Sequence, residues 1–226
     1  MLHHLHPGQR FFFALFSSFR FLINLPLLDR PLTLGFVWGL FTGDWAACLG
    51  VSLFFELLWL DVIPAGTIIP PNALAPTLAC LAALHLYGIS SPAVAAVLIV
   101  ACLPLGRLFS RLENYHRVFC NEGFNSFVLW VKNPGRPGGP AAMTRRSILV
   151  MFPINMAAFT LALAWLLALA HLGLPLLAPE LSELKLTWPH LWAVGSIGAV
   201  LSLRHRPAYA VVLAGAFLAV FSRIIP

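Results

Sequence analysis

The chain has 226 residues, of which 60% are hydrophobic and only 10% are charged, and its mean hydropathy is +0.87. A soluble domain averages about 25% charged residues, so the composition argues against a soluble enzyme module and predicts an integral membrane protein. The formal net charge of +6 comes from basic clusters beside apolar segments, which indicates membrane orientation and contact with anionic lipid rather than nucleic-acid binding.

The first apolar stretch covers residues 11–28 and is interrupted by Arg20, Asn24 and Pro26. We expect an interfacial or partly inserted helix there, because these residues would interrupt a complete span. The next stretch, residues 31–63, is too long for one crossing, since about 20 residues span a bilayer. Two helices joined by a turn at the Gly-Asp dipeptide near its middle fit this length better.

A proline-rich break, GTIIPPNALAP, lies within residues 64–76. Pro70, Pro71 and Pro76 cannot all lie in one unbroken helix, because each removes a backbone donor and clashes with the preceding turn. Non-helical backbone at membrane depth is tolerated only where it is buried in protein or lines a watery cavity. We therefore predict a re-entrant element in which Asn72 can donate and accept hydrogen bonds. The alternative is a surface loop between two spans.

Two apolar stretches follow the break, at residues 74–87 and 91–105, and the first is short for a full span. Residues 106–146 then alternate basic and apolar positions, which predicts an amphipathic segment on the membrane surface. The positive-inside rule makes this segment cytoplasmic. Its positive residues are Arg107, Arg111, Arg117, Lys132, Arg136, Arg145 and Arg146.

The C-terminal part, residues 147–226, is expected to contain the remaining spans. Residues 147–172 form a strong outward span, and residues 173–189 form an external loop. Residues 191–203 return inward, and residues 208–221 form the last apolar segment. The whole chain, residues 1–226, is therefore predicted to be one all-α, polytopic membrane domain.

Carboxylates in transmembrane segments are functional candidates, because inserting one costs about 2.5–3.5 kcal/mol. Glu56 lies in the apolar run SLFFELLWL, with no basic residue within a helical turn. It faces a polar cavity, or a partner chain or a distant arginine such as Arg30 satisfies it. Asp44 is a weaker candidate, because a turn or N-cap residue would look the same. Asp61 lies five residues after Glu56, so the two need not share a face.

No metal, cofactor or catalytic constellation is expected. The four cysteines lack CxxC or metal-ligand spacing, and the histidines are dispersed. No His–carboxylate pair suggests acid–base work, so an embedded enzyme is disfavoured. The cysteines are Cys48, Cys80, Cys102 and Cys120.

The run from Arg30 to Leu84 carries an ordered series of motifs, and the series resembles membrane subunit IIC of the mannose/sorbose family of the bacterial phosphoenolpyruvate-dependent sugar phosphotransferase system. That family typically shows an Arg-Pro-Leu start, a Gly-Asp dipeptide, a Leu-Glu pair and a Pro-Pro-Asp-Ala turn. We therefore treat residues 30–105 as the family-like core. The matching residues are Arg30-Pro31-Leu32, Gly43-Asp44, Glu56, Gly66 and Pro70-Pro71-Asn72-Ala73.

The resemblance implies a multi-pass permease subunit in the bacterial cytoplasmic (inner) membrane. Such a subunit pairs with a homologous IID subunit, and cytoplasmic IIAB proteins phosphorylate the sugar from a phosphohistidine as it is delivered. The membrane subunit itself carries no phosphorylated residue. Glu56 and Asn72 are the first candidates for sugar binding, followed by Asp44 and, more weakly, Asn24.

Several positions depart from the family pattern. Asn24-Leu25-Pro26-Leu27 replaces an Asp-Glu-Phe-Gln sequence, Asn72 replaces an acid, and Asp61 and Pro64 replace a glycine and an asparagine. The family also usually continues into a further apolar segment after the last one here. The alternative is therefore a divergent protein of the same fold that has lost transport and has a regulatory or assembly role.

Overall fold

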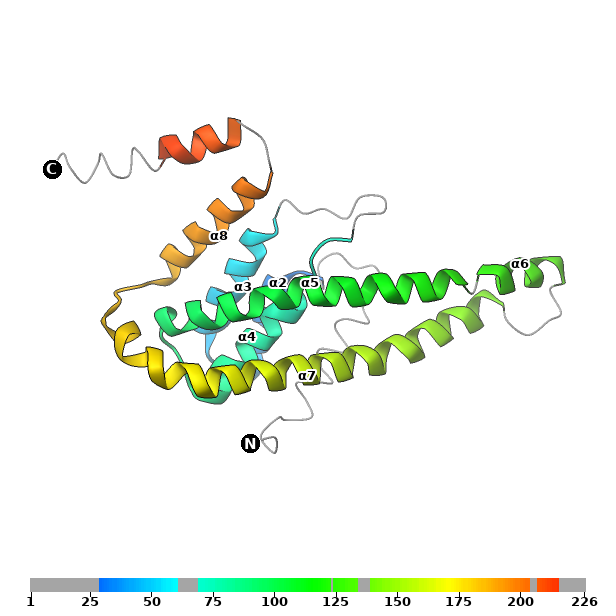
Figure 1. Cartoon of the computed structure of the whole chain (residues 1–226), viewed down its shortest axis with the longest axis horizontal. Coiled ribbons are helices and arrows are strands. Elements are labelled where there is room, and N and C mark those ends of the chain that lie inside the picture. Colours follow the sequence, from blue (N-terminus) through cyan, green and yellow to red (C-terminus); the bar gives the residue numbers. More distant parts are fainter. Residues whose placement is uncertain (1–28, 61–68, 123, 134–138, 204–206, 216–226) are drawn as a thin grey trace.

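The computed structural model describes residues 29–60, 69–122, 124–133, 139–203 and 207–215, and every regular element in these ranges is an α-helix (Figure 1). This agrees with the predicted all-α class. The expected helix at residues 11–28, and Asn24 with it, lies outside the described residues. The helices are α2 (Pro31–Thr42), α3 (Trp45–Leu58), α4 (Leu74–Tyr87), α5 (Pro92–Glu122), α6 (Phe124–Lys132), α7 (Pro140–Glu183) and α8 (Trp188–Ser202).

Helices α2 and α3 form a hairpin. Pro31 occupies the first turn of α2, where its missing N–H costs nothing. Gly43 ends α2 with φ of 76°, a left-handed conformation that glycine adopts without strain, and its N–H bonds to the carbonyl of Gly39. Asp44 then caps α3. The predicted turn between two helices at Gly43 and Asp44 is confirmed.

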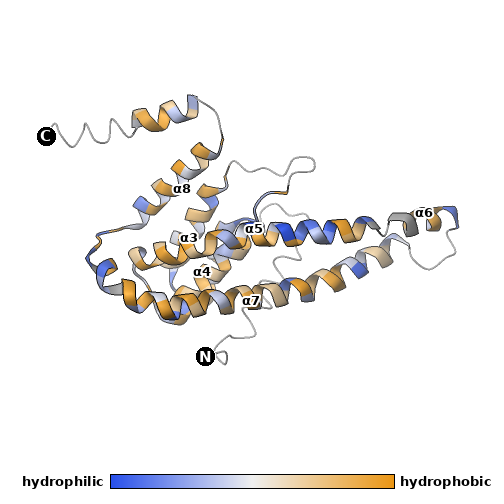
Figure 2. Cartoon of the chain, in the orientation of Figure 1, coloured by the Kyte–Doolittle hydropathy of each residue, from blue (hydrophilic) through white to orange (hydrophobic). Residues whose placement is uncertain are grey.

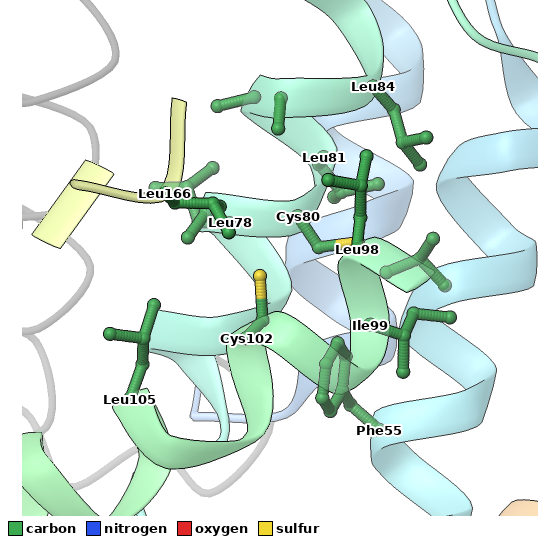
Figure 3. Close-up of a cluster of buried hydrophobic side chains, with 14 of the residues drawn as sticks. Phe55, Leu78, Cys80, Leu81, Leu84, Leu98, Ile99, Cys102, Leu105 and Leu166 are labelled. Carbon is green, nitrogen blue, oxygen red and sulfur yellow. The ribbon is translucent and has the colours of Figure 1, made fainter. Parts of the chain in front are cut away.

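Helix α4 occupies the centre of the fold and contacts α2, α3, α5 and α7. Every residue from Leu74 to Leu84 is buried, as expected for a helix that is apolar on all sides. Figure 3 shows part of this core, in which Cys80 of α4 lies beside Leu98 of α5 and Leu78 of α4 lies beside Leu166 of α7. Lipid tails are as apolar as these side chains, so in a membrane the core is stabilised by close van der Waals packing rather than by removal from water.

Small residues allow neighbouring helices to approach closely, as in many membrane proteins. A Cβ added to Gly35 of α2 would lie 1.9 Å from the Ser52 hydroxyl oxygen of α3. Gly50 of α3 lies against the Trp188 ring of α8, and the Trp192 indole N–H donates to the Gly50 carbonyl at 3.0 Å. These contacts fix the hairpin and α8 as one packed unit.

Helices α5 and α7 are longer than the sequence predicts. The segments separated at residue 105 form one 31-residue helix, α5, which continues through Pro104. The external loop expected at residues 173–189 is shorter than predicted, because α7 continues through Pro175 and Pro179 to Glu183. Both helices are long and apolar enough to cross a membrane, whereas α2, α3 and α4 have only 12 to 14 residues.

Figure 1 shows how these lengths shape the molecule. Helices α5 and α7 lie side by side, and together they extend well past α2, α3 and α4 to the turn at α6. At the other end, α7 leads through a short connection to α8, which packs on α3. The molecule therefore has a compact end and an arm, formed by the end of α5, by α6 and by the start of α7, which we define as residues 107–122, 124–133 and 139–152.

Candidate functional site

Glu56 of α3 lies against the first turn of α2. Its Oε1 accepts a hydrogen bond from the Arg30 Nη1 atom at 3.3 Å, and its Oε2 accepts one from the Leu32 backbone N–H at 3.3 Å. The first N–H groups of a helix have no partner within it, and they favour a negative charge. Glu56 thus caps α2 from a neighbouring helix. Arg30, one of the partners considered from the sequence, is confirmed as its partner.

Asn72 ends the non-helical segment and starts α4. Its Oδ1 atom accepts hydrogen bonds from the backbone N–H groups of Leu74 and Ala75, at 3.1 Å each. Its own backbone N–H donates to the carbonyl of Gly106 in α5 at 2.9 Å. The side chain therefore caps α4, and the backbone attaches the break to α5.

The break, α3 and α5 meet at Gly106. A Cβ added there would lie 3.0 Å from the Trp59 ring and 3.3 Å from the Asn72 carbonyl oxygen, so a larger residue would have to displace these neighbours slightly. Trp59 stacks on Phe55, with ring centroids 5.4 Å apart. Trp59 follows Glu56 by three residues, so Glu56 lies about one helical turn before the residue that meets Gly106.

Asp44 lies at the start of α3, at the opposite end of this helix from Glu56. Its Oδ1 atom accepts a hydrogen bond from the Ala47 N–H at 3.2 Å, which makes it the N-cap of α3. The twelve residues between Asp44 and Glu56 correspond to about 18 Å along the helix. The structure does not bring Asp44 together with Glu56 and Asn72. Asp61 lies outside the described residues.

The sequence did not single out Trp59, although its spacing of three from Glu56 places both on neighbouring positions of one helix face. It also missed a polar cluster between α5 and α7. Glu113 is 2% exposed and pairs with Arg117, with Arg117 Nε 3.1 Å from Glu113 Oε1. His116 Nε2 lies 3.3 Å from the Ser147 hydroxyl of α7. The spacing of Glu113, His116 and Cys120 by three and four residues was the available signal.

Glu56, Asn72 and Trp59 supply carboxylate oxygens, an amide and an indole ring. Carboxylate oxygens accept hydrogen bonds from hydroxyl groups, an amide both donates and accepts them, and a flat aromatic ring can pack on an apolar face. Within the described residues, no three His, Cys, Asp or Glu side chains are grouped so that they could hold a metal ion.

A family model described as "PTS system sorbose-specific iic component" matches residues 10–174, which is more than two thirds of the chain. The match includes Glu56, Trp59, Asn72 and Gly106, and it ends within α7, before α8 begins. No curated protein and no solved structure matches the chain. The family match agrees with the resemblance seen in the motif series.

Proposed function

Because the chain belongs to the family of sorbose-specific IIC components, the sugar-specific membrane subunits of phosphotransferase systems, we propose that it binds a sugar beside Glu56 and Asn72 and moves it across the membrane. The membrane is the bacterial cytoplasmic (inner) membrane, which the chain crosses several times. The observation that carries the proposal is the meeting of α3, the break before α4 and α5 at Gly106. Broken helices in transporters commonly present polar groups to a substrate in this way.

The hydrogen-bonding capacity of the site supports this proposal. A carboxylate has about four acceptor positions, and the described contacts of Glu56 use two of them. Asn72 uses its side-chain oxygen to cap α4, and its amide N–H groups form no hydrogen bond with the described residues. Free acceptors on Glu56 and donors on Asn72 complement sugar hydroxyls. Trp59 can pack on the apolar face of the ring.

The partners follow from the family. Association with other phosphotransferase components is a family property, and we propose a homologous IID-type membrane subunit and a cytoplasmic IIAB-type phosphoryl donor. Phosphoryl transfer then occurs on the partner proteins, so this chain contributes binding, orientation and translocation. Asp44 serves as a helix cap in this proposal rather than as a sugar ligand.

Uptake coupled to phosphorylation tests the proposal. Cells that express the chain with its genomic neighbours are given mannose, glucose, fructose, sorbose, N-acetylglucosamine and galactosamine, and sugar phosphates are measured against a deletion of this gene alone. We then compare Glu56→Gln with Arg30→Gln. Both variants remove the ion pair, but only Glu56→Gln removes the carboxylate.

We expect Glu56→Gln to reduce uptake at least about tenfold, which corresponds to 1.4 kcal/mol, and Arg30→Gln to reduce it much less. Equal losses in the two variants would assign Glu56 to holding α2 alone and would remove it from the sugar site. If no sugar phosphate forms although the protein is inserted, the non-transporting alternative replaces the transport proposal.

A further inference from the structure

The polar cluster between α5 and α7 places a thiol beside an imidazole and a hydroxyl group. The Cys120 sulfur lies 3.3 Å from the hydroxyl oxygen of Ser147 and 3.6 Å from the Nε2 atom of His116. The same Nε2 atom lies 3.3 Å from the Ser147 hydroxyl oxygen. His116 and Cys120 are four residues apart on α5, and Ser147 comes from α7, so the three side chains meet where the two helices of the arm pack together.

Cys120 differs from the other three cysteines in its exposure and its place. Cys48, Cys80 and Cys102 are at most 3% exposed and lie in the apolar core, whereas Cys120 is half-buried. The 31 residues of α5 correspond to about 46 Å and the hydrocarbon core is about 30 Å thick, so the end of α5 that follows its basic residues extends past the hydrocarbon. Figure 2 shows the hydrophilic residues of α5 gathered in the arm. A reagent dissolved in water can therefore reach the Cys120 thiol.

The neighbours of Cys120 suit its sulfur to nucleophilic attack. The thiolate is the attacking form of cysteine, and a base beside the thiol can remove its proton as the attack takes place. When the Nε2 atom of His116 carries no proton, it can accept the proton of the thiol. The Ser147 hydroxyl can donate a hydrogen bond to the sulfur as negative charge develops on it.

The arginines near Cys120 favour a negatively charged reagent. Arg146 of α7 lies over the ring of Phe119, the residue before Cys120, with its guanidinium carbon 5.6 Å from the ring centroid. Arg146 is exposed and forms no ion pair with the described residues, whereas Arg117 is paired with the buried carboxylate of Glu113. The positive charge of Arg146 is therefore available to attract an anion toward the sulfur.

We propose that Cys120 is a site of reversible thiol–disulfide exchange with anionic low-molecular-weight disulfides, and that His116 is its base. The Cys120 sulfur attacks one sulfur of the disulfide, and the S–S bond of the reagent breaks as the new S–S bond forms. The leaving thiolate departs with the electron pair of the broken bond, and His116 passes the proton to it or to water. Excess low-molecular-weight thiol reverses the exchange. This inference is independent of the proposed sugar transport.

Reaction of the full chain with dithiobis(nitrobenzoate), a dianionic disulfide that releases one coloured thiolate at each exchange, tests the site in phosphatidylcholine nanodiscs. We expect one thiolate per chain and none from Cys120→Ser. The matched control, Cys48→Ser, should release as much as the parent chain, because Cys48 is buried. His116→Gln removes the base but keeps a hydrogen-bonding side chain, so its reaction at pH 7 should be at least about tenfold slower. Arg146→Gln should slow the dianionic reagent but not cystamine, a cationic disulfide.

The pH dependence separates a base from a residue that only shapes access to the sulfur. At about pH 9.5 an ordinary thiol is ionised without a base, so the rates of the parent chain and of His116→Gln should converge. Equal slowing of His116→Gln at both pH values would overturn the role of His116 as base. Unchanged release from Cys120→Ser, or no reaction of the parent chain, would overturn the site itself. Equal slowing of both disulfides by Arg146→Gln would overturn the preference for anions.

Discussion

Asn72 stands at the start of α4, where its side-chain oxygen takes two backbone N–H groups. Asn72→Asp keeps this cap, because a carboxylate accepts the same bonds and favours a helix N-terminus. Asn72→Ala loses it, and we expect the free energy of unfolding to fall by about 1 kcal/mol. Thermal unfolding in detergent measures the difference. A loss as large in Asn72→Asp as in Asn72→Ala would show that the cap is not what stabilises this turn.

Of these two variants, Asn72→Asp also tests the sugar site. Asn72→Asp replaces amide donors with acceptors while the cap remains, so we expect an altered sugar preference in the uptake assay. An unchanged preference in a stable Asn72→Asp protein would make Asn72 a turn residue only. Asn72→Ala cannot serve here, because its effect on α4 would be mixed with its effect on the sugar.

The local sequence predicted the structural roles of some residues near the candidate site but gave no sign of the roles of others. A carboxylate within an apolar helix requires a partner, so Arg30 could be considered for Glu56 before the fold was known. Gly-Asp between two apolar runs likewise marks a helix end and a cap, as Asp44 shows. Trp59 gave no such signal, because one more aromatic residue in an apolar helix is usually part of the core. Its contact with Gly106 depends on tertiary packing between distant segments.

The hairpin of α2 and α3 depends on the absence of a side chain at Gly35. A Cβ there would lie 1.9 Å from the Ser52 hydroxyl oxygen and 2.8 Å from the Cys48 carbonyl oxygen, so Gly35→Ala must move the helices apart. We expect the free energy of unfolding to fall by about 1–3 kcal/mol, as is usual for overpacking. Denaturant unfolding in detergent, followed by circular dichroism, measures this change.

Gly173 in α7 provides the matched control for Gly35. No atom outside its own helix and neighbouring residues lies within 4 Å of a Cβ added there. Gly173→Ala should therefore leave stability unchanged or raise it by up to about 1 kcal/mol, because alanine favours helix over glycine. If the two variants lost equal stability, helix packing at Gly35 would not explain the effect.

Changes in polarity misled the prediction of element ends in α5 and α7. The basic residues after residue 105 and the charged residues between 180 and 185 suggested boundaries near residues 105 and 173, but α5 continues through Pro104 and α7 through Pro175 and Pro179. In the fold, α5 and α7 lie against each other, and packing along this length favours continuous helices. The sequence of either segment alone does not reveal such stabilisation by a neighbouring helix. Before α4 the helix does break, and there the sequence contains two adjacent prolines followed by an asparagine that caps the next helix.

At the scale of the whole molecule, two long helices connect the two ends of the fold. The compact end holds α4 at its centre, and the arm carries the basic residues of α5 and α7. Gly106 lies where the arm joins the compact end, in contact with Trp59 and Asn72. Under the proposed function, a sugar released at this junction would enter the side of the membrane on which the arm lies, and the proposed phosphoryl donor would act on that side.

The orientation of α7 decides whether that side is the cytoplasm. The basic arm predicts a cytoplasmic start for α7, and its apolar span then carries the chain to the opposite side before α8. In a background with Cys120→Ser, we expect a membrane-impermeant maleimide to label Lys132→Cys only in inside-out vesicles and Lys185→Cys only in intact cells. Both lysines are exposed, and the remaining native cysteines are buried. The reverse pattern would put the arm outside the cell, and labelling of both cysteine variants from one side would mean that α7 does not cross.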